Sequence, residues 1–219
     1  MSRSQGVRGT RLFLVRHGES EGNALRRFSL DPDIKLTSAG IDQARAAGLA
    51  LARFASPAHI VASPYHRARH TAALIAGEIG HEPPILIEDD LRERSIGELA
   101  GQPYDAMLHA PQYDRETFWE WCPPGGESLV DVRRRAGAVL DRLRLAHAGL
   151  DVVVVSHGGV MLALCAHVEG KFGGGRVARN CEILVVCEGE GGRLEVTALA
   201  GTALRAAPDT TVPEGASGG

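Results

Sequence analysis

The chain has 219 residues, of which 44% are hydrophobic and 23% charged, and this composition excludes a disordered or fibrous protein and fits a globular one. Its formal net charge of -3 gives no overall attraction for nucleic acid or an anionic membrane, so an anionic ligand would need a local basic pocket. The N-terminus has no apolar signal segment and no stretch approaches the roughly 20 apolar residues of a membrane span, which indicates a cytoplasmic protein.

Strand and helix patterns alternate after a polar lead at residues 1–10. Residues 11–15 form a near-continuous apolar run that is typical of a strand buried on both faces. Thr37 is the predicted N-cap of a helix that reaches about Phe54. The apolar positions that give this helix its spacing are Ile41, Ala44, Leu49 and Ala52.

The alternation continues with a strand at residues 59–63, a helix at 67–79 that ends at Gly80, and a strand at 85–87. Residues 103–121 are expected to form only short helical pieces, closed by a Pro-Pro-Gly-Gly turn. Irregular segments of this kind often carry binding residues on a rigid scaffold.

A long helix is predicted to begin at Ser128, which forms a capping-box pattern with Asp131, and to run to about Ala148. A fourth strand at residues 151–156 then leads into a helix at 158–168. The order strand, helix, strand is therefore repeated along most of the chain.

The last strands, at residues 181–187 and 194–199, are predicted to form a β-hairpin. Residues 205–219 have little apolar content and are expected to be a flexible tail, which leaves one domain over residues 11–204. Strands that alternate with helices predict a three-layer α/β/α sandwich with a mostly parallel sheet and right-handed crossovers.

The cysteines form neither a C-x-x-C pair nor a metal-ligand spacing. They are Cys122, Cys165, Cys181 and Cys187. The last three lie in apolar runs, which favours buried free thiols over disulfides and fits a reducing compartment.

Polar side chains follow each of the four predicted parallel strands. Arg16 and His17 end the first strand, Arg67 follows the second, Glu93 the third and His157 the fourth. Open α/β sheets bind ligands at the carboxyl ends of their strands, so these groups are expected to meet in one site.

Two arginines, two histidines and one carboxyl are the groups that phosphoryl transfer needs, because the transferred group spreads negative charge over its oxygens. Arg16 and Arg67 can each bind two oxygens and would lower the pKa of His17, which keeps its imidazole unprotonated for attack on phosphorus. The other ring nitrogen should donate to a backbone carbonyl.

Glu93 is the candidate acid that protonates the leaving alkoxide and then the base that activates water. His157 opens a helix whose first amides, including that of Gly158, favour an anion, so we assign both residues to phosphate binding.

Each of these residues has a structural alternative when taken alone. His17 could be a packed strand-end histidine, Arg67 a solvated helix arginine, and Glu93 part of a mixed-charge loop. Their joint occurrence at four strand ends favours the catalytic interpretation. His66 and His70 stand four residues apart and could bind a metal, but no metal or other cofactor is expected.

Five short motifs occur in a fixed order along the chain. They are LVRHGE at 14–19, LTSAG at 36–40, SPYHRARHTA at 63–72, PGGES at 124–128 and SHGG at 156–159. In this order they resemble the histidine phosphatase superfamily, which implies its phosphoglycerate mutase-like fold. The resemblance makes His17 the phosphoacceptor and Glu93 the general acid, with the phosphoryl group held by Asn23, Arg67 and His157.

Mutases of this family usually carry Glu-Arg-His-Tyr-Gly at the acid position, whereas this chain has ERSIG at residues 93–97. The missing His-Tyr pair and a shorter segment at residues 101–123 favour a phosphatase. We therefore expect a phosphoric monoester hydrolase that acts on a small phosphorylated metabolite or other phosphate monoester. Two alternatives stay open: a cofactor-dependent phosphoglycerate mutase and a non-catalytic phosphate- or phosphoprotein-binding module.

Substrate specificity is expected in residues 24–34 and 101–121. The second segment holds four aromatic residues that either line the mouth of the pocket or pack in an ordinary way. They are Tyr104, Phe118, Trp119 and Trp121.

Overall fold

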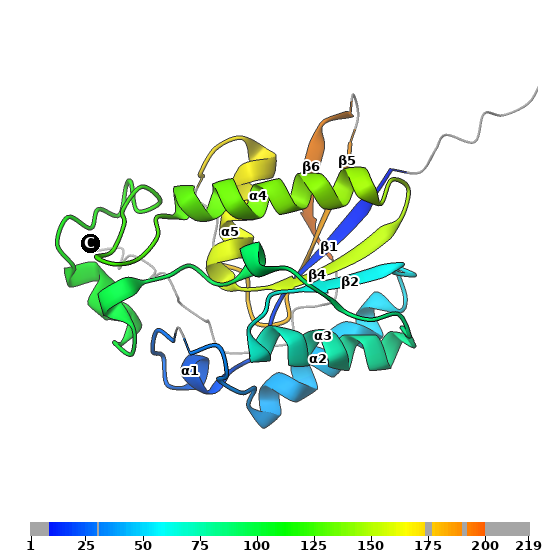
Figure 1. Cartoon of the computed structure of the whole chain (residues 1–219), viewed down its shortest axis with the longest axis horizontal. Coiled ribbons are helices and arrows are strands. Elements are labelled where there is room, and N and C mark those ends of the chain that lie inside the picture. The colour runs from blue at the N-terminus through cyan, green and yellow to red at the C-terminus, as the bar shows by residue number, and fades with distance from the viewer. Residues whose placement is uncertain (1–8, 30, 174–176, 190–191, 200–219) are drawn as a thin grey trace, which may run out of the picture.

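The structure is a computed structural model that describes residues 9–29, 31–173, 177–189 and 192–199. Most of the predicted lead at residues 1–10, and all of the predicted tail at residues 205–219, lie outside the described residues. In the described part, a six-stranded sheet lies between two pairs of helices (Figure 1).

The sheet has the strand order β3-β2-β4-β1-β5-β6. Four strands run parallel to one another: β1 (Arg11–Arg16), β2 (His59–Ala62), β3 (Leu86–Ile87) and β4 (Asp151–Ser156). The predicted hairpin pairs antiparallel with the edge of β1 and consists of β5 (Ile183–Glu188) and β6 (Leu194–Ala198). The mostly parallel three-layer sandwich expected from the sequence is therefore confirmed.

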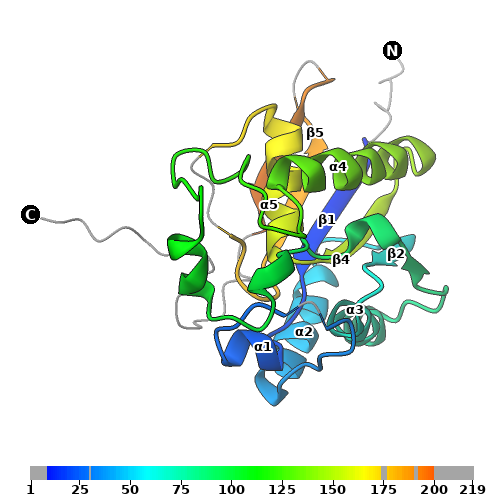
Figure 2. The ribbon, with the colours of Figure 1, turned by 60° about the vertical axis from the view of Figure 1, so that its left-hand side comes forward.

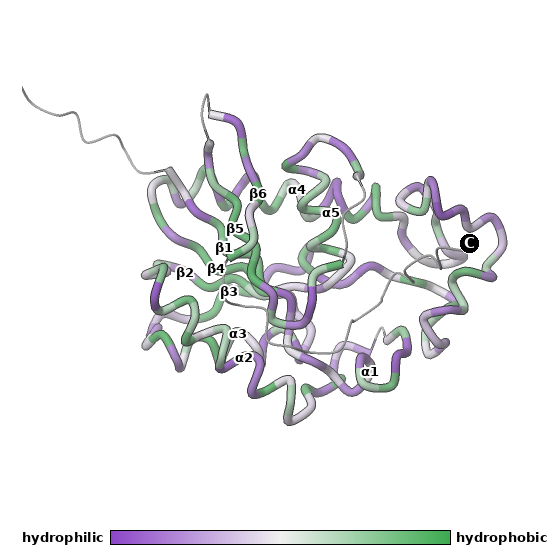
Figure 3. Tube along the Cα trace, turned by 180° about the vertical axis from the view of Figure 1, so that it is seen from behind, coloured by the Kyte–Doolittle hydropathy of each residue, from purple (hydrophilic) through white to green (hydrophobic). Residues whose placement is uncertain are grey.

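Alternate residues of β1 supply two separate cores. Leu12 and Leu14 pack on one face, beneath α4 (Leu129–Ala146) and α5 (Gly158–Glu169). Phe13 and Val15 pack on the other face, against α2 (Ser38–Leu51) and α3 (His66–Ile79). Residues 12–15 of the strand are all apolar because both of its faces are covered, and the central strands form the most hydrophobic part of the tube in Figure 3.

In the helix that begins after Thr37, the N-cap was predicted correctly but the buried face was not. Thr37 is its N-cap, as predicted, and accepts a hydrogen bond from the Gly40 amide at 3.0 Å. Leu49, however, is 54% exposed, and the buried face consists of Gly40, Ala44, Ala47, Gly48 and Leu51. Glycine at residue 48 lets α2 approach α3 closely, because a Cβ atom there would lie only 2.7 Å from the Cβ of Glu78 on α3.

Two other helix ends follow the predicted signals. Gly80 ends α3 in the left-handed conformation, with φ of 67°. Ser128 and Asp131 form the capping box of α4, in which the Asp131 amide donates to the Ser128 hydroxyl. Residues 103–121 contain an isolated β-bridge from Pro103 to Arg27, the short 3-10 helix η3 (Tyr104–His109), and otherwise turns and loops.

All four cysteines are free thiols, as expected, but their burial differs from the prediction. Cys181 is buried, whereas Cys165 and Cys187 are only partly covered. Burial raises the pKa of the Cys165 and Cys181 thiols to about 12, so neither forms a thiolate readily. None of the helices in the described ranges combines the length and apolar character that a membrane span requires.

Candidate active site

Two loop segments meet at the carboxyl end of the sheet. One contains the short helix α1 (Glu21–Ala24), and the other contains η3; Figures 1 and 2 show both at the same end of the molecule. They are joined by backbone hydrogen bonds, such as that from the Phe28 amide to the Gln102 carbonyl at 2.9 Å. The loops thereby form the walls of a pocket whose floor is the end of β1.

The two strand-end histidines lie side by side in this floor. The parallel register pairs Arg16 with Ser156, and the His17 amide donates to the Ser156 carbonyl at 2.9 Å. The rings of His17 and His157 are consequently 5.1 Å apart between centroids. Both side chains are almost fully buried.

The His17 ring is oriented by a contact on each nitrogen. Nδ1 lies 2.7 Å from the Gly18 carbonyl oxygen, which can only accept, so Nδ1 carries the proton. Nε2 then keeps its lone pair, and the Arg67 Nε donates to it at 3.3 Å. The expected carbonyl partner of the ring is therefore present, and the nitrogen that remains basic faces a cation.

Both histidines are held in the neutral form. Burial lowers the pKa of His17 well below its ordinary value of 6.5, and the charges of Arg67 and Arg16 lower it further. Burial also lowers the pKa of His157, again with help from the charge of Arg67. An unprotonated imidazole at residue 17 is therefore available at neutral pH and below.

These two buried histidines should make stability depend on pH. Unfolded histidines bind protons below about pH 6.5 while the folded ones do not, so stability is complete above that pH and falls as the pH drops toward the folded-state pKa. Each histidine contributes a slope of about 1.4 kcal/mol per pH unit in this range. Urea denaturation between about pH 7.5 and pH 5.5 should give a shallower fall for His157→Gln than for the wild type. Equal slopes would contradict the assignment.

The two predicted arginines reach the pocket from different elements. Arg67 stands in the first turn of α3, where its side chain donates to the Asp31 carbonyl at 3.2 Å and stacks on the Tyr65 ring. Arg16 ends β1 and donates to the Ala178 carbonyl at 2.7 Å. Both are buried, and both line the pocket beside His17.

Glu93 enters the same pocket from the loop after the 3-10 helix η1 (Asp89–Leu91). Its two carboxylate oxygens accept from the amides of Arg94 at 2.8 Å and Gly159 at 3.3 Å. A Cβ atom at Gly159 would lie only 2.7 Å from the Glu93 carboxylate, so glycine at this position allows the approach. The side chain is thereby held at the N-terminus of α5.

Asn23 reaches the pocket wall through α1, a helix that the sequence analysis did not predict. Ser20 and Asn23 form its capping box, and the Asn23 amide group donates to the Tyr104 hydroxyl at 3.0 Å. Gly158 also lines the pocket, at the start of α5. His157 lies behind the wall against His17 and is not itself among the lining residues.

Two site residues were missed in the sequence. Asn180 donates to the His17 carbonyl at 2.9 Å and to the Asn23 side chain at 3.2 Å, although no motif pointed to it. Ser63 lies 2.7 Å from Nε2 of His157. Ser63 directly follows β2, so the strand-end argument that selected Arg67 could also have selected this hydroxyl.

The aromatic residues of the second specificity segment divide into two groups. Tyr104 and Phe118 line the pocket, which matches the first of the two expectations. Trp121 instead packs, with its indole nitrogen donating to the Pro111 carbonyl at 3.0 Å, and Trp119 stacks on Phe172.

His66 and His70 have ring centroids 5.6 Å apart on α3. Within the described ranges, no group of three or more potential ligands gathers that could hold a metal ion.

The fold and this pocket define a class of protein: a three-layer α/β/α sandwich with a histidine and two arginines converging at the carboxyl edge of its sheet. The family described as the histidine phosphatase superfamily (branch 1) matches residues 12–200. The chain therefore belongs to the histidine phosphatase superfamily.

The similar proteins in this superfamily include both phosphatases and mutases by name. The chain is 35% identical over 174 residues to a glucosyl-3-phosphoglycerate phosphatase of Mycolicibacterium vanbaalenii, covering 75% of this chain and 76% of the relative. It is 38% identical over 174 residues to a 2,3-bisphosphoglycerate-dependent phosphoglycerate mutase of Methylobacterium radiotolerans, covering 73% and 79%. It also matches a bifunctional protein of Mycobacterium tuberculosis, with 37% identity over 157 residues, but spans only 42% of that longer protein.

A solved structure confirms the fold at the level of coordinates. The native structure of a mycobacterial glucosyl-3-phosphoglycerate phosphatase superposes with a TM-score of 0.75 and 27% identity. The match covers 86% of this chain and 97% of the other.

Proposed function

We propose that this chain is a metal-independent phosphatase that hydrolyses small phosphate monoesters through a phosphohistidine on His17. The observation that carries the proposal is the orientation of His17. Its Nδ1 is occupied by the Gly18 carbonyl, and its Nε2 lies beside the Arg67 guanidinium in a pocket that also contains Glu93. A basic nitrogen, cations for the phosphoryl oxygens and a carboxyl for proton transfer are thereby within one cavity.

In the first step, the lone pair of His17 Nε2 attacks phosphorus and the bond between phosphorus and the ester oxygen breaks. Glu93 gives its proton to that oxygen, so an alcohol leaves instead of an alkoxide. Arg16 and Arg67 stabilise the charge on the other phosphoryl oxygens. We assign Asn23, the Gly158 amide and His157 to binding the same group, His157 from its position against the His17 ring.

In the second step, the Glu93 carboxylate takes a proton from water, and the water oxygen attacks phosphorus. The bond between phosphorus and Nε2 breaks, and its electron pair returns to the ring. Inorganic phosphate leaves, and Glu93 is again protonated for the next substrate. Every proton transfer in the cycle is between Glu93 and either the leaving group or water.

We favour phosphatase over mutase activity because of the residues that form the pocket wall next to Glu93. Where mutases usually carry a His-Tyr pair, this chain has Ser95 and Ile96. Ile96 is a buried apolar residue that lines the pocket, and the Ser95 amide is bound by the Glu127 carboxylate. This wall offers no imidazole to a second anionic group of a phosphoglycerate.

Rapid mixing with 4-nitrophenyl phosphate tests the proposal. We expect a burst of nitrophenol, a phosphoenzyme that is labile in acid and stable in alkali, and phosphate release that EDTA does not reduce. Interconversion of 2- and 3-phosphoglycerate, given a bisphosphorylated primer, would instead identify a mutase. Tight binding of inorganic phosphate without release from any ester would identify a binding module.

A further inference from the structure

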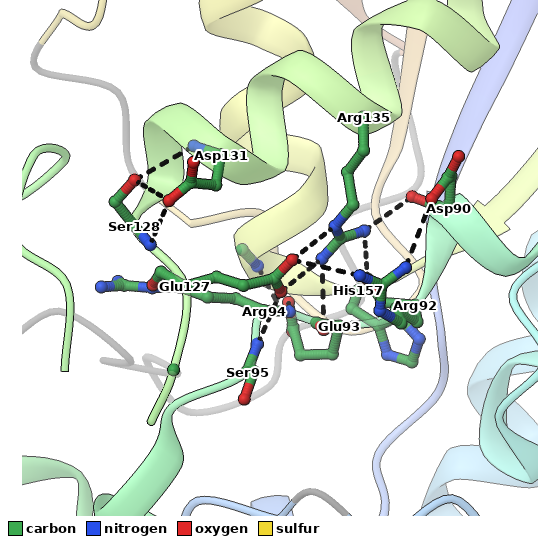
Figure 4. Close-up of polar contacts among 12 residues, drawn as sticks. Asp90, Arg92, Glu93, Arg94, Ser95, Glu127, Ser128, Asp131, Arg135 and His157 are labelled. Carbon is green, nitrogen blue, oxygen red and sulfur yellow. Dashed lines mark hydrogen bonds and ion pairs between the residues drawn. The ribbon is translucent and has the colours of Figure 1, made fainter. Parts of the chain in front are cut away.

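The loop that carries Glu93 is held by one side chain from a distant helix. Arg135 of α4 donates through Nη1 to the carbonyls of Asp90 at 2.6 Å and Arg92 at 2.9 Å. Its Nη2 donates to the carbonyl of Glu93 itself at 3.3 Å. Figure 4 shows Arg135 reaching down from α4 to this loop. A single guanidinium therefore binds three carbonyls around the candidate general acid.

Glu127 completes this contact from the opposite side. Its carboxylate oxygens each accept a bond of 2.9 Å from Arg135, through Nε and Nη2. The same carboxylate accepts from the Ser95 amide at 3.0 Å and from the Arg92 side chain at 3.2 Å. Arg135 and Glu127 thus form hydrogen bonds to the backbone before and after Glu93.

The local backbone explains why side chains are needed here. Residues 92–96 belong to neither a helix nor a strand, so no regular hydrogen-bond ladder fixes their path. Arg135 projects from a helix whose neighbouring Val132 and Ala136 are fully buried in the core. The forked guanidinium can bind carbonyls and a carboxylate at once, which the single ammonium of lysine cannot do with the same geometry.

The ion pair is also well protected. The side chains of Arg135 and Glu127 are only 10% and 19% exposed. Burial by itself would raise the pKa of Glu127, but the hydrogen bonds from Arg135 and the Ser95 amide, with the charges of Arg135 and Arg92, lower that pKa overall. Glu127 is therefore ionised at neutral pH and keeps Arg135 in place.

We propose that Arg135, paired with Glu127, is a positioning residue that aims the Glu93 carboxyl at the oxygen of the leaving group. The proposal rests on the proposed function, in which Glu93 is the general acid. The carboxyl of Glu93 has only two amide donors of its own in the described structure, one of them the adjacent Arg94 amide. The direction of the side chain therefore depends on the path of the loop.

Loss of this positioning should have a chemical signature. Protonation by an acid helps most when the leaving oxygen is strongly basic and helps little when it is weakly basic. Displacement of the acid should therefore lower the rate of hydrolysis of esters of basic alcohols or phenols much more than that of 4-nitrophenyl phosphate. A general loss of folded enzyme slows all esters by the same factor.

The test measures kcat/KM of Arg135→Met on 4-nitrophenyl, phenyl and 4-methoxyphenyl phosphates, which differ in leaving-group basicity more than in shape. We expect the 4-methoxyphenyl ester to lose at least about 10-fold more than the 4-nitrophenyl ester. Arg134→Met is the matched control, because Arg134 is the preceding arginine of α4 and is exposed, and within the described residues its ion pair is with Asp131 rather than with the Glu93 loop. It should change neither rate nor selectivity.

A double-mutant cycle with Glu93→Gln separates the possible results. If Arg135 acts through Glu93, Arg135→Met should cost little further selectivity once Glu93 is replaced. Equal losses on all three esters, or fully additive effects, would overturn the proposal. If Glu93→Gln alone produces no selectivity, the general-acid assignment itself fails. Should Arg135→Met not fold, Arg135→Lys and Glu127→Gln provide the same comparison, with the same outcomes expected.

Discussion

Replacing His17 with alanine is expected to lower kcat for phosphate release by about 10³-fold or more. The variant lacks the Nε2 that we propose as nucleophile, and water attacks a monoester directly only at a very low rate. The two arginines and Glu93 remain, so phosphate esters should still bind. We therefore expect a large loss of kcat and of the labelled phosphoenzyme, with little change in affinity for inorganic phosphate.

The measurement is phosphate release together with trapping of the phosphoenzyme. His109→Ala is a suitable control, because His109 is an exposed histidine at the end of η3 and takes no part in the pocket lining. It should keep wild-type turnover and full labelling. If His17→Ala retains more than a few per cent of wild-type turnover, the phosphohistidine at this position is wrong, whatever else the pocket does.

The central sheet and the strand-end residues could be predicted because short-range patterns determine them. A continuous apolar run such as residues 12–15 indicates a strand covered on both faces, and the side chains that follow such strands meet at one edge of a parallel sheet. This rule placed His17, Arg67 and Glu93 in one pocket without any knowledge of the loops between them.

The remaining features depend on contacts between distant residues. Leu49 has the spacing of a buried residue, but its exposure is set by where α3 packs against α2. Asn180 binds His17 across 163 positions of sequence, and Arg135 binds the Glu93 loop across 42. Nothing local distinguishes Arg135 from the two arginines that directly precede it in the chain. Only the fold turns one of them toward the loop.

The second large effect is expected for Arg67→Met. In the proposed mechanism the Arg67 guanidinium makes charge-assisted hydrogen bonds to phosphoryl oxygens, each with a net contribution of about 1.5–3 kcal/mol. Loss of two such bonds should lower kcat/KM by about 10²–10⁴-fold. Arg67→Lys should recover only part of this loss, because an ammonium group keeps the charge but not the fork.

The same substitution should also change the titration of the histidines. The charge of Arg67 lowers the pKa of both His17 and His157, after burial, so both pKa values should rise in Arg67→Met. The nucleophile is active only when unprotonated, so the acid limb of the pH-rate profile should move to higher pH. NMR titration of the ring protons measures the pKa values directly.

Arg69→Met is the matched control, since Arg69 is an exposed arginine on the same helix, two residues along. It should leave both kcat/KM and the histidine pKa values unchanged. Arg67 is buried with its Nε 3.3 Å from His17 Nε2, the proposed nucleophile, so in the proposed mechanism this one position links phosphate binding to the charge state of His17. A variant that lost phosphate affinity without any rise in the His17 pKa would break that link, because the cation would then bind substrate without tuning the nucleophile.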